Sequence, residues 1–247
     1  MIRNSSLHLI ESVEESLSLL SKSWNITPEI YDLHLGKRND LGEELIDING
    51  VIFHLPFLSN ESQYVLWNCL WPDCHNCCER QTRIPLTKDD IRILANKLGQ
   101  NLPDFIKKET LISTWTDGEL FGPVNTVRTQ LCLKRRVDET EKDSGSMISC
   151  RFLDNENGCS IHSHKPGVCW MYPFASYLDT NSTRKITIHA KFQFTGDCPG
   201  FYLDKSMDRI IPILEEYSKK IFAYHMEYNR SKREGYCGRS SITLNRT

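Results

Sequence analysis

Four of the ten cysteines of this chain lie within residues 69–78, which read Cys-Leu-Trp-Pro-Asp-Cys-His-Asn-Cys-Cys. Packing does not explain this crowding, because buried structural thiols behave as small, single apolar side chains. Thiolates are soft ligands for zinc and for the iron of iron–sulfur clusters, and a Cys-x-x-Cys turn brings two sulfurs to one metal. Cys74 and Cys77 have that spacing, and together with Cys69 they also match the spacing of plant-type ferredoxins. The segment therefore predicts a metal site and leaves the choice of metal open.

Cys78 directly follows Cys77, and neighbouring side chains diverge on a helix or a strand. We therefore expect these two thiols to serve different irons, different sites or different roles. Four further cysteines lie in a stretch rich in Gly, Pro, Asn, Asp and His, a composition typical of loops. The two groups give eight candidate metal ligands: Cys69, Cys74, Cys77, Cys78, Cys150, Cys159, Cys169 and Cys198.

Short motifs follow one another in a specific order between residues 64 and 202. They are Cys74-His-Asn-Cys77-Cys78, Ile84-Pro-Leu-Thr-Lys-Asp-Asp-Ile91, Cys150-Arg-Phe-Leu153, Cys159-Ser-Ile-His162, Lys165-Pro166, Cys169-Trp-Met-Tyr-Pro-Phe174 and Cys198-Pro-Gly200. This order resembles the YkgJ-type cysteine-cluster family, whose domain is described as zinc- or iron-chelating. The chain has His75-Asn76 where the family usually has glycine, and Lys165 where it usually has arginine. The better understood relatives look like flagellin lysine N-methylases with an iron–sulfur cluster, so the resemblance implies a metal centre and, for some members, methyl transfer.

The spacing of the cysteines favours an iron–sulfur cluster over zinc. Structural zinc sites usually contain two Cys-x-x-Cys or Cys/His pairs, whereas only Cys74 and Cys77 form such a pair here. The last four candidate ligands are separated by 8, 9 and 28 residues. A cage built from distant loops suits a cluster with several irons, so we predict an iron–sulfur cofactor, with zinc as the alternative.

Other sulfur and nitrogen donors are interpreted separately. Cys132 lies outside the motifs in an alternating segment and is interpreted as a structural thiol, and Cys237 is not included in the ligand set. His162 is expected to hold a loop by a hydrogen bond to a cluster sulfur or to the backbone, as groups beside metal ligands do. A mixed Cys/His zinc site or a Rieske-type arrangement that uses His75, His162 or His164 stays open.

A chain of 247 residues, 39% of them hydrophobic, can bury one sizeable core. We predict an α+β fold with a small irregular cysteine-rich core around the metal cluster, short strands, an N-terminal helix and a long C-terminal helix. The expected organisation is an N-terminal helix and strand extension over residues 1–63, a cysteine-cluster domain over 64–202, and a C-terminal helix with a basic tail over 203–247.

The periodicity of hydrophobic residues predicts where the main helices and strands lie. Its period predicts helices over residues 6–22 and 207–231 and strands over 128–135 and 184–195, with a further strand over 147–152 and short strands within 23–63. Thr87 is a predicted N-cap of a helix that Gly99 ends. A second short helix is expected from Pro103 to Lys108.

Composition limits the partners. The formal net charge of −2 gives no overall field that would recruit nucleic acid or an anionic membrane. The first residues lack an apolar core of signal-peptide length, and no run of eighteen apolar residues occurs. We expect a cytoplasmic protein with reduced thiols, an unidentified protein partner, and neither membrane nor nucleic acid among its partners.

Three functions are compatible with these features. The first is an accessory metal-cluster protein that carries electrons, senses redox state or handles metal. The second is a cluster-dependent protein lysine N-methyltransferase, and the third is a zinc-stabilised interaction module. The chain has no Gly-x-Gly and no Gly-x-x-x-x-Gly-Lys motif, so a nucleotide or methyl-donor site of a familiar type is unsupported. The accessory role therefore ranks first, and no catalytic residue is assigned.

Overall fold

The computed structural model describes residues 28–34, 36–79, 83–117, 126–135, 150–154, 158–180, 186–193, 198–235 and 241–242. The predicted helix over 6–22 and Cys237 lie outside these residues. Of the predicted strand over 147–152, the described part holds an isolated bridge between Cys150 and Arg135 followed by a turn.

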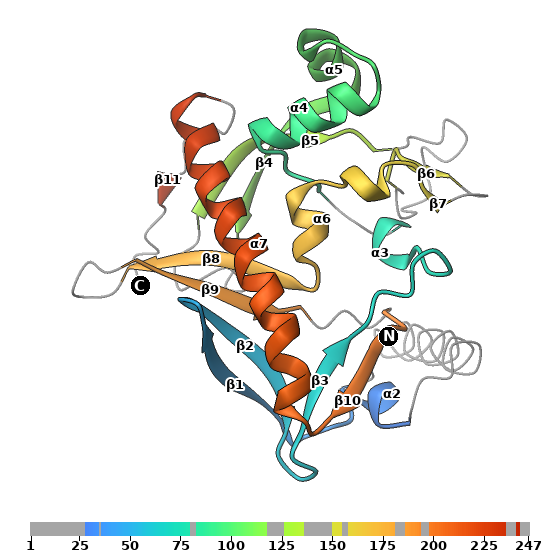
Figure 1. Ribbon diagram of the computed structural model, residues 1–247, viewed down its shortest axis with the longest axis vertical. Helices are drawn as coiled ribbons and strands as arrows, with labels where there is room; N and C mark the ends of the chain where they lie inside the picture. The colour runs from blue at the N-terminus through green and yellow to red at the C-terminus, as the bar shows by residue number, and fades with distance from the viewer. Residues whose placement is uncertain are drawn as a thin grey trace, which may run out of the picture.

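Strands and helices follow one another in separate runs along the chain, which confirms the α+β class (Figure 1). The helices are α2 (Pro28–His34), α3 (Asn76–Glu79), α4 (Lys88–Lys97), α5 (Leu102–Glu109), the 3-10 turn η2 (His162–His164), α6 (Gly167–Met171) and α7 (Met207–Arg233). The strands are β1 (Leu41–Ile48), β2 (Val51–Leu58), β3 (Gln63–Trp67), β4 (Thr110–Asp117), β5 (Thr126–Leu133), β6 (Leu153–Asp154), β7 (Gly158–Cys159), β8 (Phe174–Thr180), β9 (Ile186–Phe192), β10 (Phe201–Asp204) and β11 (Ser241–Ile242).

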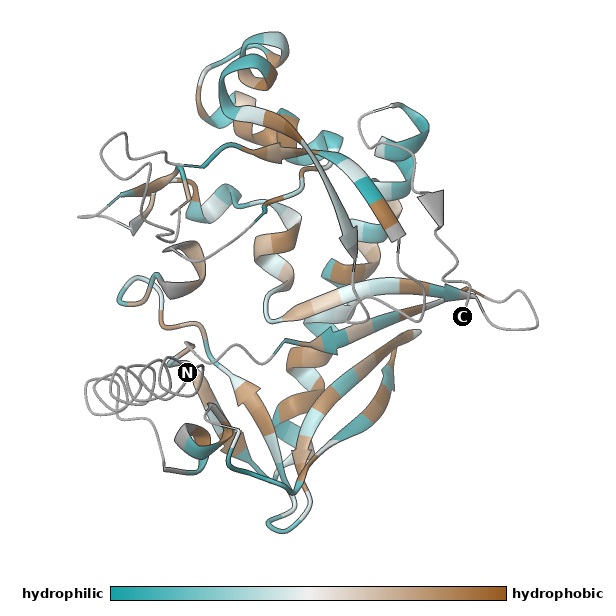
Figure 2. Ribbon diagram, turned by 180° about the vertical axis from the view of Figure 1, so that it is seen from behind, coloured by the Kyte–Doolittle hydropathy of each residue, from teal (hydrophilic) through white to brown (hydrophobic). Residues whose placement is uncertain are grey.

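A six-stranded mixed sheet forms the larger part of the fold. Its order is β10-β3-β2-β9-β8, and β1 pairs with β2. The β2–β9 pair is parallel, whereas the other pairs are antiparallel. Strand β2 buries Val51, Phe53 and Leu55 on one face, and the residues between them are partly exposed on the other. Figure 2 shows that hydrophobic and hydrophilic residues both occur along the strands of this sheet. The alternation along β2 confirms the predicted short strands within residues 23–63.

Two residues, Asn49 and Gly50, determine the turn of the hairpin between β1 and β2. Ile48 pairs with Val51, so only Asn49 and Gly50 form the loop. Both have positive φ, at 54° and 80°, which is the backbone of a type I′ turn and the reason for the Asn-Gly sequence. The turn sets the register that places the apolar side chains of β2 on the buried face.

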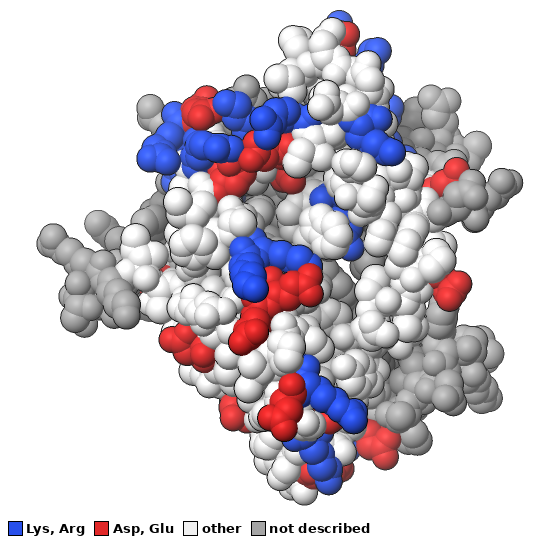
Figure 3. All heavy atoms as spheres, in the orientation of Figure 1, with Lys and Arg blue, Asp and Glu red and all other residues white. Residues whose placement is uncertain are grey.

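Helix α7 crosses one face of this sheet and confirms the predicted long C-terminal helix (Figure 1). Its buried side chains include Ile210, Leu214 and Ile221, which join Phe53 and Phe174 of the sheet in the first hydrophobic core. On the face seen in Figure 3, acidic and basic side chains lie next to one another, in line with ion pairs along α7 such as Lys220 with Glu216. Within the described chain, no helix is both long and apolar enough to cross a bilayer.

A second core lies between α4, α5 and the segments that carry several cysteines. It contains Leu86, Ile91, Leu94, Phe105 and Ile161, all almost fully buried. The predicted helix start is confirmed, because the side chains and backbones of Thr87 and Asp90 form a reciprocal capping box, and Gly99 has a φ of 63° just after α4. Helix α5 confirms the predicted second helix, with Asn101 as its N-cap.

The two cores meet near the predicted metal ligands. Val168 of α6 packs against both, while Cys198 borders the first core and Cys78, Cys159 and Cys169 border the second. The six-stranded sheet takes β1 and β2 from the predicted extension and β3, β8 and β9 from the predicted cysteine-cluster domain. The metal-cluster core stays a prediction, but its candidate ligands lie where the two apolar cores adjoin.

Candidate metal centre

The eight predicted ligands come from six places along the chain. They lie in the loop after β3 (Cys69 and Cys74), in α3 (Cys77 and Cys78), in the turn before β6 (Cys150), in β7 (Cys159), in α6 (Cys169) and just before β10 (Cys198). Loops and very short elements therefore carry them, as the composition around the last four cysteines predicted.

Five of these thiols interact with one another, and we call them the inner thiols: Cys77, Cys78, Cys150, Cys159 and Cys169. A hydrogen bond with the Cys77 side chain, burial, and the charges of Cys77, Cys159 and Cys169 raise the pKa of Cys78. Burial and then the charges of Cys150, Cys77 and Cys159 raise the pKa of Cys169. The backbone N–H of Cys150 also donates to the carbonyl of Cys78 at 2.8 Å. Residues 77–78 and three positions within residues 150–169 thus converge on one region.

Cys77 also connects this group to Cys74 and Cys198. Burial raises the pKa of Cys198 to about 11, and the charges of Cys74 and Cys77 contribute in the same direction. Hydrogen bonds from the backbone of Gly200 and the side chain of Tyr172 oppose this rise. Cys77 is therefore the inner thiol that also acts on Cys198, together with Cys74 of the loop after β3.

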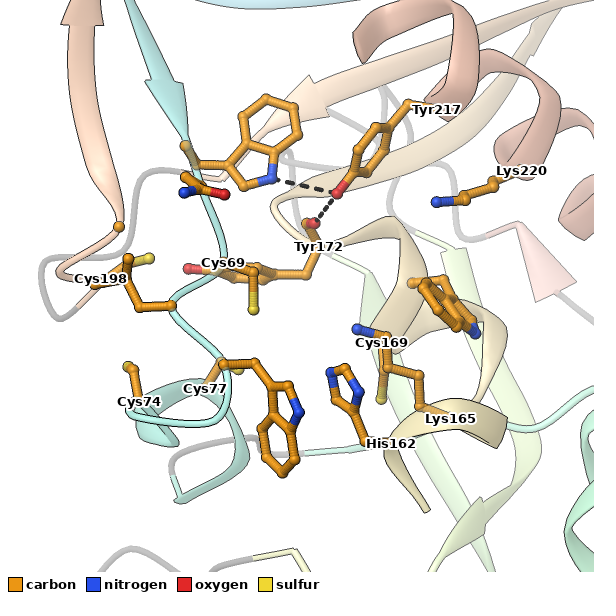
Figure 4. A pocket seen from close by; sticks show the side chains of 16 residues that line it. Cys69, Cys74, Cys77, His162, Lys165, Cys169, Tyr172, Cys198, Tyr217 and Lys220 are labelled. Atoms are coloured by element: carbon orange, nitrogen blue, oxygen red, sulfur yellow. Dashed lines mark hydrogen bonds between the residues drawn. The ribbon is translucent and has the colours of Figure 1, made fainter. Parts of the chain in front are cut away.

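A pocket of about 360 Å3 opens beside these cysteines. Figure 4 shows Cys69, Cys74 and Cys198 on one side of it and Cys169 with two lysines on the other. The pocket lining thus includes five of the eight candidate ligands: Cys69, Cys74, Cys77, Cys169 and Cys198.

The convergence stops short of a formed coordination sphere. Within the residues that the structure describes, no three side chains of the His, Cys, Asp and Glu types form a group arranged to hold a metal ion. The structure brings the predicted ligands into one neighbourhood, and the eight-residue ligand set itself stays a prediction.

The chemistry of the group nevertheless fits a soft metal. Burial is the largest cause of the raised pKa values of Cys150, Cys159 and Cys169, because a thiolate without a counter-charge is costly in apolar surroundings. A bound metal cation reverses this cost and deprotonates coordinating thiols. Nearby, Nε2 of His75 is buried and has no hydrogen-bond partner among the described residues. Thiols that range from exposed (Cys77) to buried (Cys150) and an unsatisfied nitrogen are therefore the donors of this region.

Aromatic rings hold the histidines of the site. Trp71 stacks on His162 with ring centroids 4.2 Å apart and planes at 7°, and it meets His75 edge-on at 5.6 Å. Gly158 makes room for them, since a Cβ there would lie 2.4 Å from the Trp71 ring and 2.8 Å from His75 Nε2. The sequence predicted a hydrogen-bonding role for His162, whereas the structure shows a stacking contact that fixes the ring.

Two glycines, one in a motif (Gly200) and one between two motifs (Gly167), allow close approach of the backbone. A Cβ at Gly200 would lie 2.1 Å from the carbonyl oxygen of Asn68, and the carbonyl of Gly200 accepts a 2.8 Å hydrogen bond from the N–H of Asn68. This contact holds the segment of Cys198 against that of Cys69. At Gly167, a Cβ would meet the Tyr224 ring at 2.8 Å, so this glycine lets α6 pack closely on α7.

Helix α7 reaches the pocket through Tyr217. Tyr217 is partly buried against the first core and also lines the pocket. Its hydroxyl accepts from Trp67 Nε1 at 3.2 Å and donates to the carbonyl of Tyr172 at 3.0 Å (Figure 4). Burial raises the pKa of Tyr217 to about 12, so the hydroxyl stays a donor at neutral pH. Periodicity alone cannot distinguish a core tyrosine from one that also faces a cavity.

Cys132 differs from the predicted ligands. It is 1% exposed in β5, and burial raises its pKa. The side chains that oppose this rise are Ser113, Arg83 and Arg135, and no other cysteine contributes to it. These surroundings agree with the interpretation of Cys132 as a structural thiol.

Comparison with known proteins gives one match. No curated protein and no solved structure matches the chain. Residues 68–193 match the family model CxxCxxCC, described as a putative zinc- or iron-chelating domain. The match spans about half of the 247 residues and includes every predicted ligand except Cys198. It confirms the family resemblance of the motifs, and the chain belongs to this CxxCxxCC family.

Proposed function

We propose that this protein binds an iron–sulfur cluster through its cysteine loops and serves an accessory, redox or metal-handling role. The observation that carries the proposal is the convergence of the inner thiols, which come from α3 and from three positions within residues 150–169 and influence one another's pKa values. A mononuclear zinc site and an iron–sulfur cluster both take four ligands. The cluster spreads its ligand positions over several irons, which suits thiols supplied by separate loops, whereas structural zinc sites usually use two Cys-x-x-Cys or Cys/His pairs and only Cys74 and Cys77 form such a pair here.

Different residues of this chain would hold the metal group and cover it. The inner thiols and Cys74 or Cys198 would hold the group, while Trp71 and His162 would cover it on one side. When bound, an iron–sulfur cluster supplies one-electron transfer at a potential that hydrogen bonds and solvent exposure adjust. The apolar cores on both sides of the loops would limit the access of water and keep the loops fixed. A redox role implies a protein partner and a compartment that keeps thiols reduced, which we propose to be the cytoplasm.

A second candidate is a cluster-dependent protein lysine N-methyltransferase. The pocket beside the cysteines favours it, because a reaction at the metal centre needs a cavity in which a substrate is placed. Zinc with a purely structural role is the alternative for the metal, and the protein would then be an interaction module.

Absorption spectroscopy on anaerobically purified full-length protein tests the proposal. An iron–sulfur protein absorbs broadly near 400 nm and loses part of that absorbance reversibly on reduction with dithionite. A colourless protein would contradict the proposal. Calorimetric titration of the same sample with S-adenosylmethionine separates the two candidate functions, since micromolar affinity, which corresponds to about 8 kcal/mol, would favour the methyltransferase.

A further inference from the structure

The side of the pocket opposite Cys69 and Cys198 is basic and aromatic. Lys165 and Lys220 line it, and no Asp or Glu is among the described residues that do so. The rings of Trp67, Trp71, Trp170, Tyr172 and Tyr217 form much of the remaining wall. A cavity of about 360 Å3 with apolar walls and a few polar groups is of the size that takes a small molecule.

Trp170 positions both lysines. The Nζ atom of Lys165 lies 4.3 Å from the centre of the Trp170 ring, and that of Lys220 lies 4.9 Å from it. Lys220 also lies 5.4 Å from the Tyr217 ring. Cation–π contact attracts an ammonium group without neutralising its charge, so both groups keep the capacity to pair with an anion.

The two lysines differ in their other partners. Lys220 pairs with Glu216 one turn earlier in α7, but Glu216 is 67% exposed, and a pair of this kind is weak because water screens it. Lys165 has no ion pair with any side chain in the described part of the chain, although its charge lowers the pKa of Cys159 and Cys169. An anion that enters the pocket would therefore meet two ammonium groups and no fixed carboxylate in the wall.

We infer that this pocket binds a small organic anion with a planar apolar body. Its charged head would lie at Lys165 and Lys220, and its body would pack on the aromatic wall beside the metal centre. The inference rests on the proposed function only in placing the ligand next to a metal. A lysine side chain is a poor ligand for this pocket, because it would bring a third ammonium group next to those of Lys165 and Lys220.

Three probes with the same ring and different charges test this inference: benzoate, benzamide and benzylamine. Calorimetry or ligand-observed NMR on full-length protein, purified without oxygen, measures their affinities at one ionic strength. We expect benzoate to bind about tenfold or more tighter than either benzamide or benzylamine, which corresponds to about 1.4 kcal/mol. Lys165→Met and Lys220→Met should each weaken benzoate binding about tenfold and leave benzamide binding unchanged.

Lys219→Met is the matched control, because Lys219 is exposed on the same helix and does not line the pocket. Equal affinity for benzamide and benzoate, absence of benzoate binding, or equal losses from Lys219→Met and Lys165→Met would overturn the inference. Metal content is measured on every sample. If the metal content is normal and benzoate does not bind, the anion pocket is rejected and the proposed function is retained. If benzoate binds in a Lys165-dependent way to a protein without metal, the proposed function is rejected and the anion pocket is retained.

Discussion

The backbone N–H of Gly167 donates a 2.9 Å hydrogen bond to Oδ1 of Asp90, a carboxylate that is 9% exposed. The other oxygen, Oδ2, accepts from both the backbone N–H and the hydroxyl of Thr87 at 2.8 Å. One side chain thus caps α4 and fixes the start of α6, which carries Cys169. These contacts give a physical reason for the Thr-x-x-Asp motif of this chain. The sequence alone predicted the N-cap of α4 and did not predict the contact between Asp90 and α6.

Asp90→Ala should therefore damage both the fold and the centre. Three donors, two of them buried, lose their acceptor, so the free energy of unfolding should fall by about 2–4 kcal/mol, and metal content should fall with it. Asp104→Ala is the matched control, because Asp104 occupies the same position after Asn101 in α5 but is exposed. It should cost about 1 kcal/mol or less and leave metal content unchanged. Equal effects of the two substitutions in urea denaturation would contradict this role of Asp90.

Gly200→Ala should separate the segments that carry Cys198 and Cys69. Its Cβ would lie 2.1 Å from the Asn68 carbonyl oxygen, so one of the two backbones must move. We expect lower metal content and a loss of stability of about 1–3 kcal/mol, as for other overpacked positions. Gly42→Ala in β1 is the control, since its Cβ would be at an ordinary 3.7 Å from the nearest described atom. Normal metal content in Gly200→Ala would show that this contact does not hold the site together.

The inner thiols should differ from Cys132 in metal binding. Cys77→Ser and Cys169→Ser should each lower metal content and stability, because a centre held by distant loops couples metal binding to folding. Cys132→Ser should retain the metal, since no other cysteine contributes to the pKa shift of Cys132. Elemental analysis of the three variants checks this expectation, and metal loss from Cys132→Ser would mean that the ligand set is drawn wrongly.

The stability of the first core should depend on pH through His225. Burial, with a smaller contribution from Arg128, lowers the pKa of His225 from 6.5 to about 4, and its Nε2 lies 3.0 Å from the Ser176 hydroxyl. Between these two pH values the unfolded chain binds more protons than the folded chain, so stability rises with pH and is complete above the unfolded value. Lowering the pH from 7 to 4 should remove up to about 3 kcal/mol through this residue.

Urea denaturation at several pH values measures this effect. His225→Gln has no titrating group at this position, so the stability difference between the two proteins should change across this pH range. A constant difference from pH 7 to 4 would contradict the depressed pKa of His225.

The parts of the fold that the sequence predicted are those set by local patterns. Helices α4, α5 and α7 and strands β5 and β9 have caps or a clear hydrophobic period. Strand β8 was not predicted, because the neighbours Phe174 and Ala175 are both buried and the next two residues, Ser176 and Tyr177, are both partly buried, so the strand has no period of two. Strand β4 was not predicted either, since both Leu111 and Ile112 are exposed in the structure.

The residues of the candidate site also fall into those that the sequence predicted and those that it did not. The thiols were identified by residue type and order, which need no tertiary information. The aromatic and basic wall was not identified, because Trp71, Tyr217 and Lys220 come together only after the loops pack on α7. In the sequence, Tyr217 belongs to an ordinary helical stripe and Lys220 to an ordinary charged face.

The decisive measurement for the metal centre is the quantification of iron, acid-labile sulfide and zinc in the anaerobically purified full-length protein. We predict iron and sulfide in comparable amounts, little zinc, and a loss of both iron and sulfide in Cys77→Ser. Stoichiometric zinc without sulfide would contradict the iron–sulfur assignment, and a folded protein without any bound metal would contradict the metal centre itself.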